Sequence, residues 1–386
     1  MRCGRAVGAV GIVVATLFGS VGGAAAVRQR ATVSWQLLSG ARGGLPSTAT
    51  VTSAVRFRGR LYVTGAVGAG GPAKRCESAG CNPAVWSSLG GSSWVQVLSV
   101  PARGSTPGSL LAASSNRLVL FAGGMGTALW TSRTGQAWWG VPLTRQMGAL
   151  SVRDVVWYHH KFVAVLGNRF AGGPNHAYGA SDEVWTSPDG LRWRQAHVAG
   201  PPSYFASIAA TRSGYILGGS SRVSGRSEVW TSSTGENWRL GSAPSGHGAL
   251  VLGVRGRHVV AVQLNNGAAG GSATEGRLSW RDGGSGWHRA SPDSYMISLR
   301  WEPSSVLLVV KSGFLVVGST PASLYLSKTG SSWAQTADVD APKLPAGSVQ
   351  SLSAVGDPQM MVVTASSPAA SRANGPKVWA VTVHAT

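Results

Sequence analysis

Short apolar runs occur in pairs along the chain, and a few polar residues separate the two runs of each pair. Six pairs lie at residues 52–65, 109–124, 151–167, 207–219, 250–262 and 306–318. Runs of this length, joined by a tight polar turn, predict two antiparallel strands. No segment keeps apolar residues at a helical period over several turns. The pattern therefore predicts an all-β fold.

A tryptophan-rich signature follows each pair after a loop. Its form is W-x-S-x-[D/T/G]-G-x-x-W, with variants in the last two copies, and its second Trp recurs at positions 94, 138, 193, 238, 287 and 333. The Ser-x-x-Gly segment predicts a turn between two further strands, so each unit is a four-stranded antiparallel sheet. Four-stranded units that recur about every 48 residues predict a β-propeller.

The two ends of the repeat complement each other. A seventh unit begins at residues 348–366 and continues to 376–383 with Trp379, but the sequence contains no second Trp after it. A strand-like segment at residues 31–39 carries Trp35. We expect this segment to be the missing fourth strand, which predicts seven blades closed without an open sheet edge. An open solenoid is the competing architecture, and it does not explain this complementarity.

The third copy resembles the Asp-box, or bacterial neuraminidase repeat, of sialidase-like β-propellers and their non-enzymatic secreted relatives. Ser187, Asp189, Gly190 and Trp193 carry the resemblance. In the other copies Gly or Thr replaces the Asp, or the Asp is shifted by one residue, which favours a structural role. A short polar side chain fixes the turn, Gly takes the positive φ, and Trp packs between sheets. The resemblance places this turn on the face opposite the family's ligand site.

Sialidase chemistry requires an arginine cluster, a tyrosine nucleophile paired with Glu, and an acid/base Asp. The family's F/Y-R-I-P motif is absent, and the predicted first strands of the units are mostly small or apolar. Only the third offers charge there, with Arg153 and Asp154, which we expect to form a local salt bridge. We therefore expect a binding or scaffold module. The alternatives are a divergent sialidase-like glycoside hydrolase and an assembly factor for a membrane complex.

The first 26 residues have the pattern of a secretory signal. Arg2 and Arg5 precede an apolar run at 6–19, and small residues end at Ala26. Cleavage there would leave residues 27–386 as a single extracellular or cell-envelope domain. An uncleaved anchor is the alternative, but the run is short for a membrane span. In an oxidising compartment we expect a disulfide between Cys76 and Cys81.

Composition and charge narrow the function classes. With 43% hydrophobic and 8% aromatic residues the chain is not disordered, and its 54 Gly show no collagen period. The net charge of +20 predicts attraction to anionic partners. We expect an anionic envelope polymer or a protein partner, no specific nucleic acid, no cofactor, no metal and a monomer. A compositional origin of the charge, serving only solubility, is the alternative.

The candidate ligand-binding residues are mainly basic and lie in two groups of predicted loops. In a propeller, the loops between the second and third strands share one face with the loops between blades. The candidates are Lys74, Arg75, Arg145, Arg169, His176, Tyr178, Arg222, Arg226, Arg277, Arg300, Trp301, Arg372 and Lys377. Arg is favoured where carboxylates or phosphates are held. This face is the predicted site.

Overall fold

The computed structural model describes the strands and the shorter turns of the chain. The described residues are 31–37, 45–46, 49–67, 81–100, 108–124, 126–167, 182–264, 274–297, 306–310, 313–317, 324–335, 337–338, 349–354, 361–365 and 377–385. The predicted signal peptide and Cys76 lie outside them. Cys81 is described and is buried near Ala66. The disulfide and the export signal stay predictions.

The first three sheets follow the chain in order. The first contains β2 (Ala49–Phe57), β3 (Arg60–Val67), β4 (Asn82–Ser88) and β5 (Val95–Ser99). The second contains β6 (Gly108–Ala113), β7 (Leu118–Gly124), β8 (Gly126–Ser132) and β9 (Trp139–Val141). Helix α1 (Arg145–Gly148) leads to the third, with β10 (Ser151–Tyr158), β11 (Lys161–Gly167), β12 (Glu183–Ser187) and β13 (Arg194–Gln195).

The next three sheets repeat the order. The fourth contains β14 (His197–Val198), β15 (Ser203–Thr211), β16 (Gly214–Ser221), β17 (Ser227–Ser232) and β18 (Asn237–Gly241). The fifth contains β19 (Ala249–Arg255), β20 (His258–Leu264), β21 (Thr274–Asp282) and β22 (His288–Ile297). The sixth contains β23 (Leu307–Val310), β24 (Gly313–Val317), β25 (Leu324–Ser327) and β26 (Ala334–Gln335).

The last sheet combines strands from far apart in the sequence. It contains β27 (Ala337–Asp338), β28 (Val349–Ala354), β29 (Met361–Ala365), β30 (Lys377–Ala385) and β1 (Ala31–Leu37), in the order β27-β1-β30-β29-β28. Trp379 lies opposite Leu37, two residues after Trp35. Trp185 likewise lies opposite Gln195, two residues after Trp193. Trp35 therefore holds the position of the second signature Trp.

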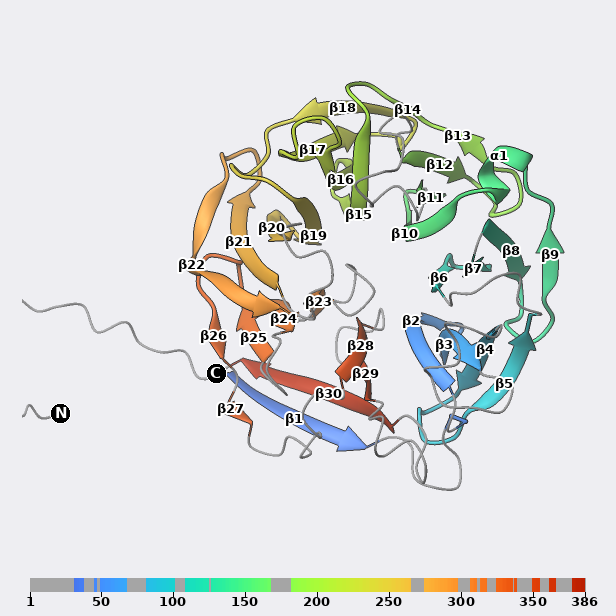
Figure 1. Cartoon of the computed structure of the whole chain (residues 1–386). Coiled ribbons are helices and arrows are strands. Elements are labelled where there is room, and N and C mark those ends of the chain that lie inside the picture. Colours follow the sequence, from blue (N-terminus) through green and yellow to red (C-terminus); the bar gives the residue numbers. More distant parts are fainter. Residues whose placement is uncertain are drawn as a thin grey trace, which may run out of the picture.

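The sheets lie around a common centre (Figure 1), and the innermost strands are β2, β6, β10, β15, β19, β23 and β28. Antiparallel pairing within each four-stranded unit confirms the predicted all-β fold. Apolar residues fill the space between neighbouring sheets. One such cluster joins Val163 and Val165 of β11 to Phe205, Trp230 and Trp238 of the fourth sheet. Because both faces of these sheets are covered, their middle strands are almost continuously apolar.

Within the described residues, no helix is long and apolar enough to span a membrane.

Candidate functional site

The innermost strands carry β-bulges that re-aim their side chains. Among the described residues, the register shifts between Val51 and Ser53, Val152 and Asp154, Phe205 and Ser207, and Val349 and Ser351. A bulge inserts one extra residue and turns the following side chain away from the regular alternation. The residue after each bulge is polar, although the surrounding strand is largely apolar.

These polar side chains tie neighbouring sheets together. Ser53 Oγ accepts the N–H of Leu111 at 3.3 Å, which joins the first sheet to the second. Ser207 Oγ accepts the N–H of Leu252 at 2.9 Å and donates to the carbonyl of Leu250 at 3.1 Å. Innermost strands have no partner within their own sheet on the central side. The side chains after the bulges therefore satisfy backbone groups that would otherwise face the centre.

A pocket of about 260 Å³ lies where the innermost strands meet. We call it the central pocket. Its walls come from six sheets and are mostly small or apolar. They are Thr52, Ser53, Ala54, Leu110, Leu111, Asp154, Val155, Ser207, Val251, Leu252, Leu307, Leu308 and Val309. Val309 is 38% exposed there. The pocket can accept an apolar side chain, and its one described carboxylate is Asp154.

Asp154 ties the third sheet to the fourth. Its Oδ2 accepts the N–H of Ile208 at 2.8 Å, and its Oδ1 accepts the N–H of Val155 at 2.8 Å. Burial raises the pKa of this carboxyl to about 7, although the two backbone hydrogen bonds act to lower it. Asp154 is the residue after a bulge, like Ser53 and Ser207, and it makes the same contact. Its geometry is that of a structural link.

This shifted pKa predicts a pH-dependent stability. Because the folded protein retains a proton that the unfolded chain loses near pH 4, the free energy of unfolding should fall between about pH 4 and pH 7. The slope from this group is at most about 1.4 kcal/mol per pH unit. We expect Asp154→Asn to remove that slope, measured by urea unfolding followed through Trp fluorescence.

Asp189→Asn is the control for this prediction. Burial acts to raise the pKa of Asp189, but hydrogen bonds from the Arg192 and Leu191 backbone and from the Ser187 and Arg192 side chains lower it to about 2. Its titration therefore lies below the measured range. A parent protein and an Asp154→Asn variant with equal slopes would contradict the prediction.

A buried carboxylate, Asp182, joins the edges of the third and fourth sheets. It lies 3.0 Å from Arg153 Nε and 2.8 Å from Arg222 Nη2, and it accepts the N–H of Phe205 at 2.9 Å. Arg153 also donates to the hydroxyl of Tyr204 at 3.2 Å and lies 4.3 Å from its ring centroid. The prediction of a salt bridge between Arg153 and Asp154 is therefore wrong. The bulge separates the two side chains, so Arg153 reaches Asp182 and Asp154 turns to the central pocket.

Comparisons with known proteins agree with this architecture. No protein-family model and no curated protein sequence matches the chain. A solved structure, "YCF48 bound to D1 peptide", is similar over 93% of this chain and 97% of that one, with 14% identity and a TM-score of 0.54. A virginiamycin B lyase from Staphylococcus aureus is similar over 92% and 99%, with 8% identity and a TM-score of 0.53.

A puromycin-hydrolysing peptidase from Mycobacterium tuberculosis is similar over 85% of this chain but only 53% of its own, with 13% identity and a TM-score of 0.56. The chain has the fold of a β-propeller. These identities show the fold alone. The more specific resemblance to sialidases stays a prediction.

The structure describes only some of the predicted ligand-binding residues, and those differ in exposure. Lys74, Arg75, Arg169, His176, Tyr178, Arg300, Trp301 and Arg372 lie outside the described residues, and of Lys377 only the backbone is described. Arg145 on α1, Arg226 after β16 and Arg277 on β21 are exposed. Arg222 is engaged with Asp182, and its side chain is 9% exposed. Its contacts give it a structural role, which the sequence did not indicate.

The signature turn has the expected structural geometry. In the third sheet, Ser187 Oγ accepts the N–H of Gly190 at 2.8 Å, and Asp189 Oδ1 accepts the N–H groups of Leu191 and Arg192 at 2.9 and 3.0 Å. Gly190 has φ +70°, which an L side chain rarely adopts. The same serine-to-glycine bond recurs at residues 88–91, 132–135, 232–235 and 327–330. These contacts hold the turn and leave Asp189 committed to it.

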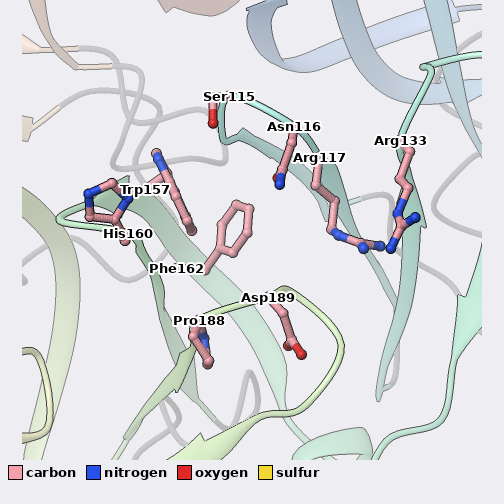
Figure 2. A pocket seen from close by; sticks show the side chains of 9 residues that line it. All are labelled: Ser115, Asn116, Arg117, Arg133, Trp157, His160, Phe162, Pro188 and Asp189. Carbon is pink, nitrogen blue, oxygen red and sulfur yellow. The ribbon is translucent and has the colours of Figure 1, made fainter.

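Sequence reasoning missed a second pocket. It has a volume of about 340 Å³ and lies between the second and third sheets, beside the signature turn that holds Asp189. Figure 2 shows two arginine side chains and several aromatic rings around it. The signal in the sequence was the basic character of the turns between first and second strands, such as Arg117 and His160.

Proposed function

We propose that this protein is an exported, seven-bladed β-propeller that acts as a binding or scaffold module in the extracellular or cell-wall space. Strand β1 completes the seventh blade in this proposal, and residues 1–26 direct export. The pairing of β1 with β30 and the seven sheets of the described strands support the blade count. The disulfide between Cys76 and Cys81 would rigidify one loop of the first blade.

The observation that carries the binding role is the chemistry of the central pocket. Its described walls are small or apolar apart from Thr52, Ser53, Ser207 and Asp154, and Asp154, its one described carboxylate, holds two backbone N–H groups. Hydrolysis of a glycoside generally requires two carboxyl groups about 5–10 Å apart across the bond. Apolar concave walls with few polar groups are typical of sites that hold an apolar group. The described pocket thus favours binding over hydrolysis.

The partner that fits this pocket best is a protein that inserts an apolar side chain. Val309 offers an exposed apolar surface there. The solved structure of YCF48 with a D1 peptide supports a peptide ligand for a propeller of this kind. Assembly of a membrane complex would be one form of such a scaffold role. An anionic envelope polymer is the second candidate, favoured by the exposed Arg145, Arg226 and Arg277 and by the net charge of +20.

Binding of the purified protein to cell envelopes, across a salt series, tests the proposal. We expect Val309→Glu to abolish binding, because a charge at the pocket opposes insertion of an apolar group. Val223→Glu is the matched control, since Val223 is 80% exposed and does not line the pocket. Both positions are exposed, so both variants should fold.

The salt series distinguishes the partners. Binding through the apolar pocket should change little with salt. Binding to an anionic polymer should fall steeply with salt and should be lost when Arg145, Arg226 and Arg277 are replaced together by Glu. Binding that neither Val309→Glu nor these charge reversals weaken would overturn the proposed sites.

A further inference from the structure

The pocket between the second and third sheets has one basic wall and one aromatic wall. We call it the intersheet pocket, and its lining residues are Ser115, Asn116, Arg117, Arg133, Trp157, His160, Phe162, Pro188 and Asp189. In Figure 2 the side chains of Arg117 and Arg133 extend toward each other on one side, while Trp157 and His160 lie on the other. Its volume of about 340 Å³ is in the range of small-molecule sites.

Arg117 is a buried cation with little compensation. It is only 6% exposed, donates to the hydroxyl of Thr131 at 3.2 Å and lies 5.9 Å from the ring of Trp139. Burial lowers its pKa, the charge of Arg133 lowers it further, and Asp189 raises it. Neither arginine forms an ion pair with any residue that the structure describes. A buried guanidinium is normally paired with an acceptor of opposite charge.

Asp189 does not supply that charge fully. Its carboxylate accepts two backbone N–H groups of the signature turn and forms an ion pair with Arg192, at 3.3 Å. None of the described hydrogen bonds and ion pairs of this carboxylate joins it to Arg117 or Arg133. The described charges around the pocket therefore sum to a positive value, even with Asp189 ionised.

The interface between the third and fourth sheets contains a carboxylate that the intersheet pocket lacks. Lys161 and Arg117 hold equivalent positions in their sheets. Each comes directly after the turn that joins the first two strands and pairs with the residue directly before that turn. Lys161 forms an ion pair with Glu236 in the signature turn of the fourth sheet, at 2.5 Å. The position equivalent to Glu236 in the third sheet, directly after the turn Gly, is Leu191. Glu236 thus neutralises the cation at the interface between the third and fourth sheets. The interface between the second and third sheets has no carboxylate at that position.

We propose that the intersheet pocket binds an oxyanion, the carboxylate or phosphate of a small molecule whose apolar or ring portion packs on Trp157. The oxyanion lies between Arg117 and Arg133, in the place that Glu236 takes at the neighbouring interface. Arginine suits this role because its planar N–H groups match carboxylate and phosphate oxygens. The residues are separate from those of the central pocket, so the site does not depend on the proposed function.

Calorimetric titration of the full chain with phenyl phosphate, benzoate and the neutral benzamide tests the site. We expect at least one of the two anions to bind and benzamide not to bind, and the tighter anion identifies phosphate or carboxylate as the preferred group. Arg133→Ala should weaken binding at least about tenfold, because the charge-assisted hydrogen bonds of an arginine to an oxyanion are about twice as strong as neutral ones. Arg239→Ala, at an exposed arginine on β18 outside the pocket lining, should change it less than about twofold.

Leu191→Glu provides a second measurement. It supplies the carboxylate that Glu236 supplies to Lys161, so it should abolish binding of the anion. Leu191 is half-buried against the core between the second and third sheets. Leu191→Gln is therefore the matched control, because it loses the same packing without adding a charge; it should keep anion binding and have a lower melting temperature than Leu191→Glu. Equal binding of benzamide and the anions, or equal losses in Arg133→Ala and Arg239→Ala, would show nonspecific attraction to a basic protein and overturn the proposal.

Discussion

Replacing Asp182 with Ala should lower the free energy of unfolding by about 3–5 kcal/mol. Its carboxylate is fully buried between Arg153 and Arg222, whose side chains are 18% and 9% exposed. Removing it leaves two poorly hydrated guanidinium groups beside each other without the carboxylate they share, and it leaves the N–H of Phe205 without its acceptor. Urea unfolding followed by Trp fluorescence measures the effect.

Two further variants make this prediction specific. Arg257→Ala removes an ion pair with Asp282 in which the arginine side chain is 71% exposed, so it should cost less than about 1 kcal/mol. Adding Arg222→Leu to Asp182→Ala should recover part of the lost stability, because one of the two uncompensated charges disappears. Equal losses for Asp182→Ala and Arg257→Ala would show that burial of the Asp182 site contributes nothing.

Replacing Gly219 with Ala should destabilise the protein by a similar amount, about 3–5 kcal/mol, or prevent folding. An added Cβ would lie 2.0 Å from the carbonyl oxygen of Tyr204 and 3.0 Å from its carbonyl carbon. Gly219 pairs with Phe205, directly before the bulge in β15. The clash is with backbone, so no side-chain rotation relieves it, and the two strands must separate.

Gly140→Ala is the matched control for Gly219→Ala. Gly140 also lies in a strand, β9, but no atom lies within 4 Å of its added Cβ. We expect a change within about 0.5 kcal/mol, since the substitution meets no neighbour. Thermal unfolding of both variants measures the difference. Similar melting temperatures for the two would mean that β15 and β16 are not as closely apposed as described.

The strands and their turns were predictable because their signals are local. Apolar runs, polar turns and the Ser-x-x-Gly segment define each four-stranded unit within a few dozen residues. Even the pairing of the strands that carry Trp35 and Trp379 followed from one segment that lacked what another supplied. The ion pair between Arg153 and Asp182 was not predictable. A bulge leaves no clear mark in the sequence, and it decides whether a charged side chain faces its neighbour or a carboxylate in another loop.

The candidate sites were harder to predict than the fold. The predicted basic face depends on loops of which the structure describes only a part, so most of its residues stay predictions. Arg222 resembles its neighbours in sequence, but its role depends on Asp182, which lies 40 positions earlier. The proposed role of the intersheet pocket depends on a comparison between sheets, because Leu191 stands where the fourth sheet has the carboxylate of Glu236. Aligning Lys161 with Arg117 and Glu236 with Leu191 would have indicated it, since both comparisons need only the repeat.

The pairing of β1 with β30 also constrains how the chain can fold. Almost the whole sequence lies between these strands, so the sequence separation of their paired residues is far larger than in any hairpin of the other sheets. During synthesis, β1 must wait unpaired until the ribosome has released β30. Until then β1 exposes the backbone groups that later pair with β30, and other chains can pair with them. The last sheet should therefore form in the slowest step, and the cell must prevent aggregation during that interval.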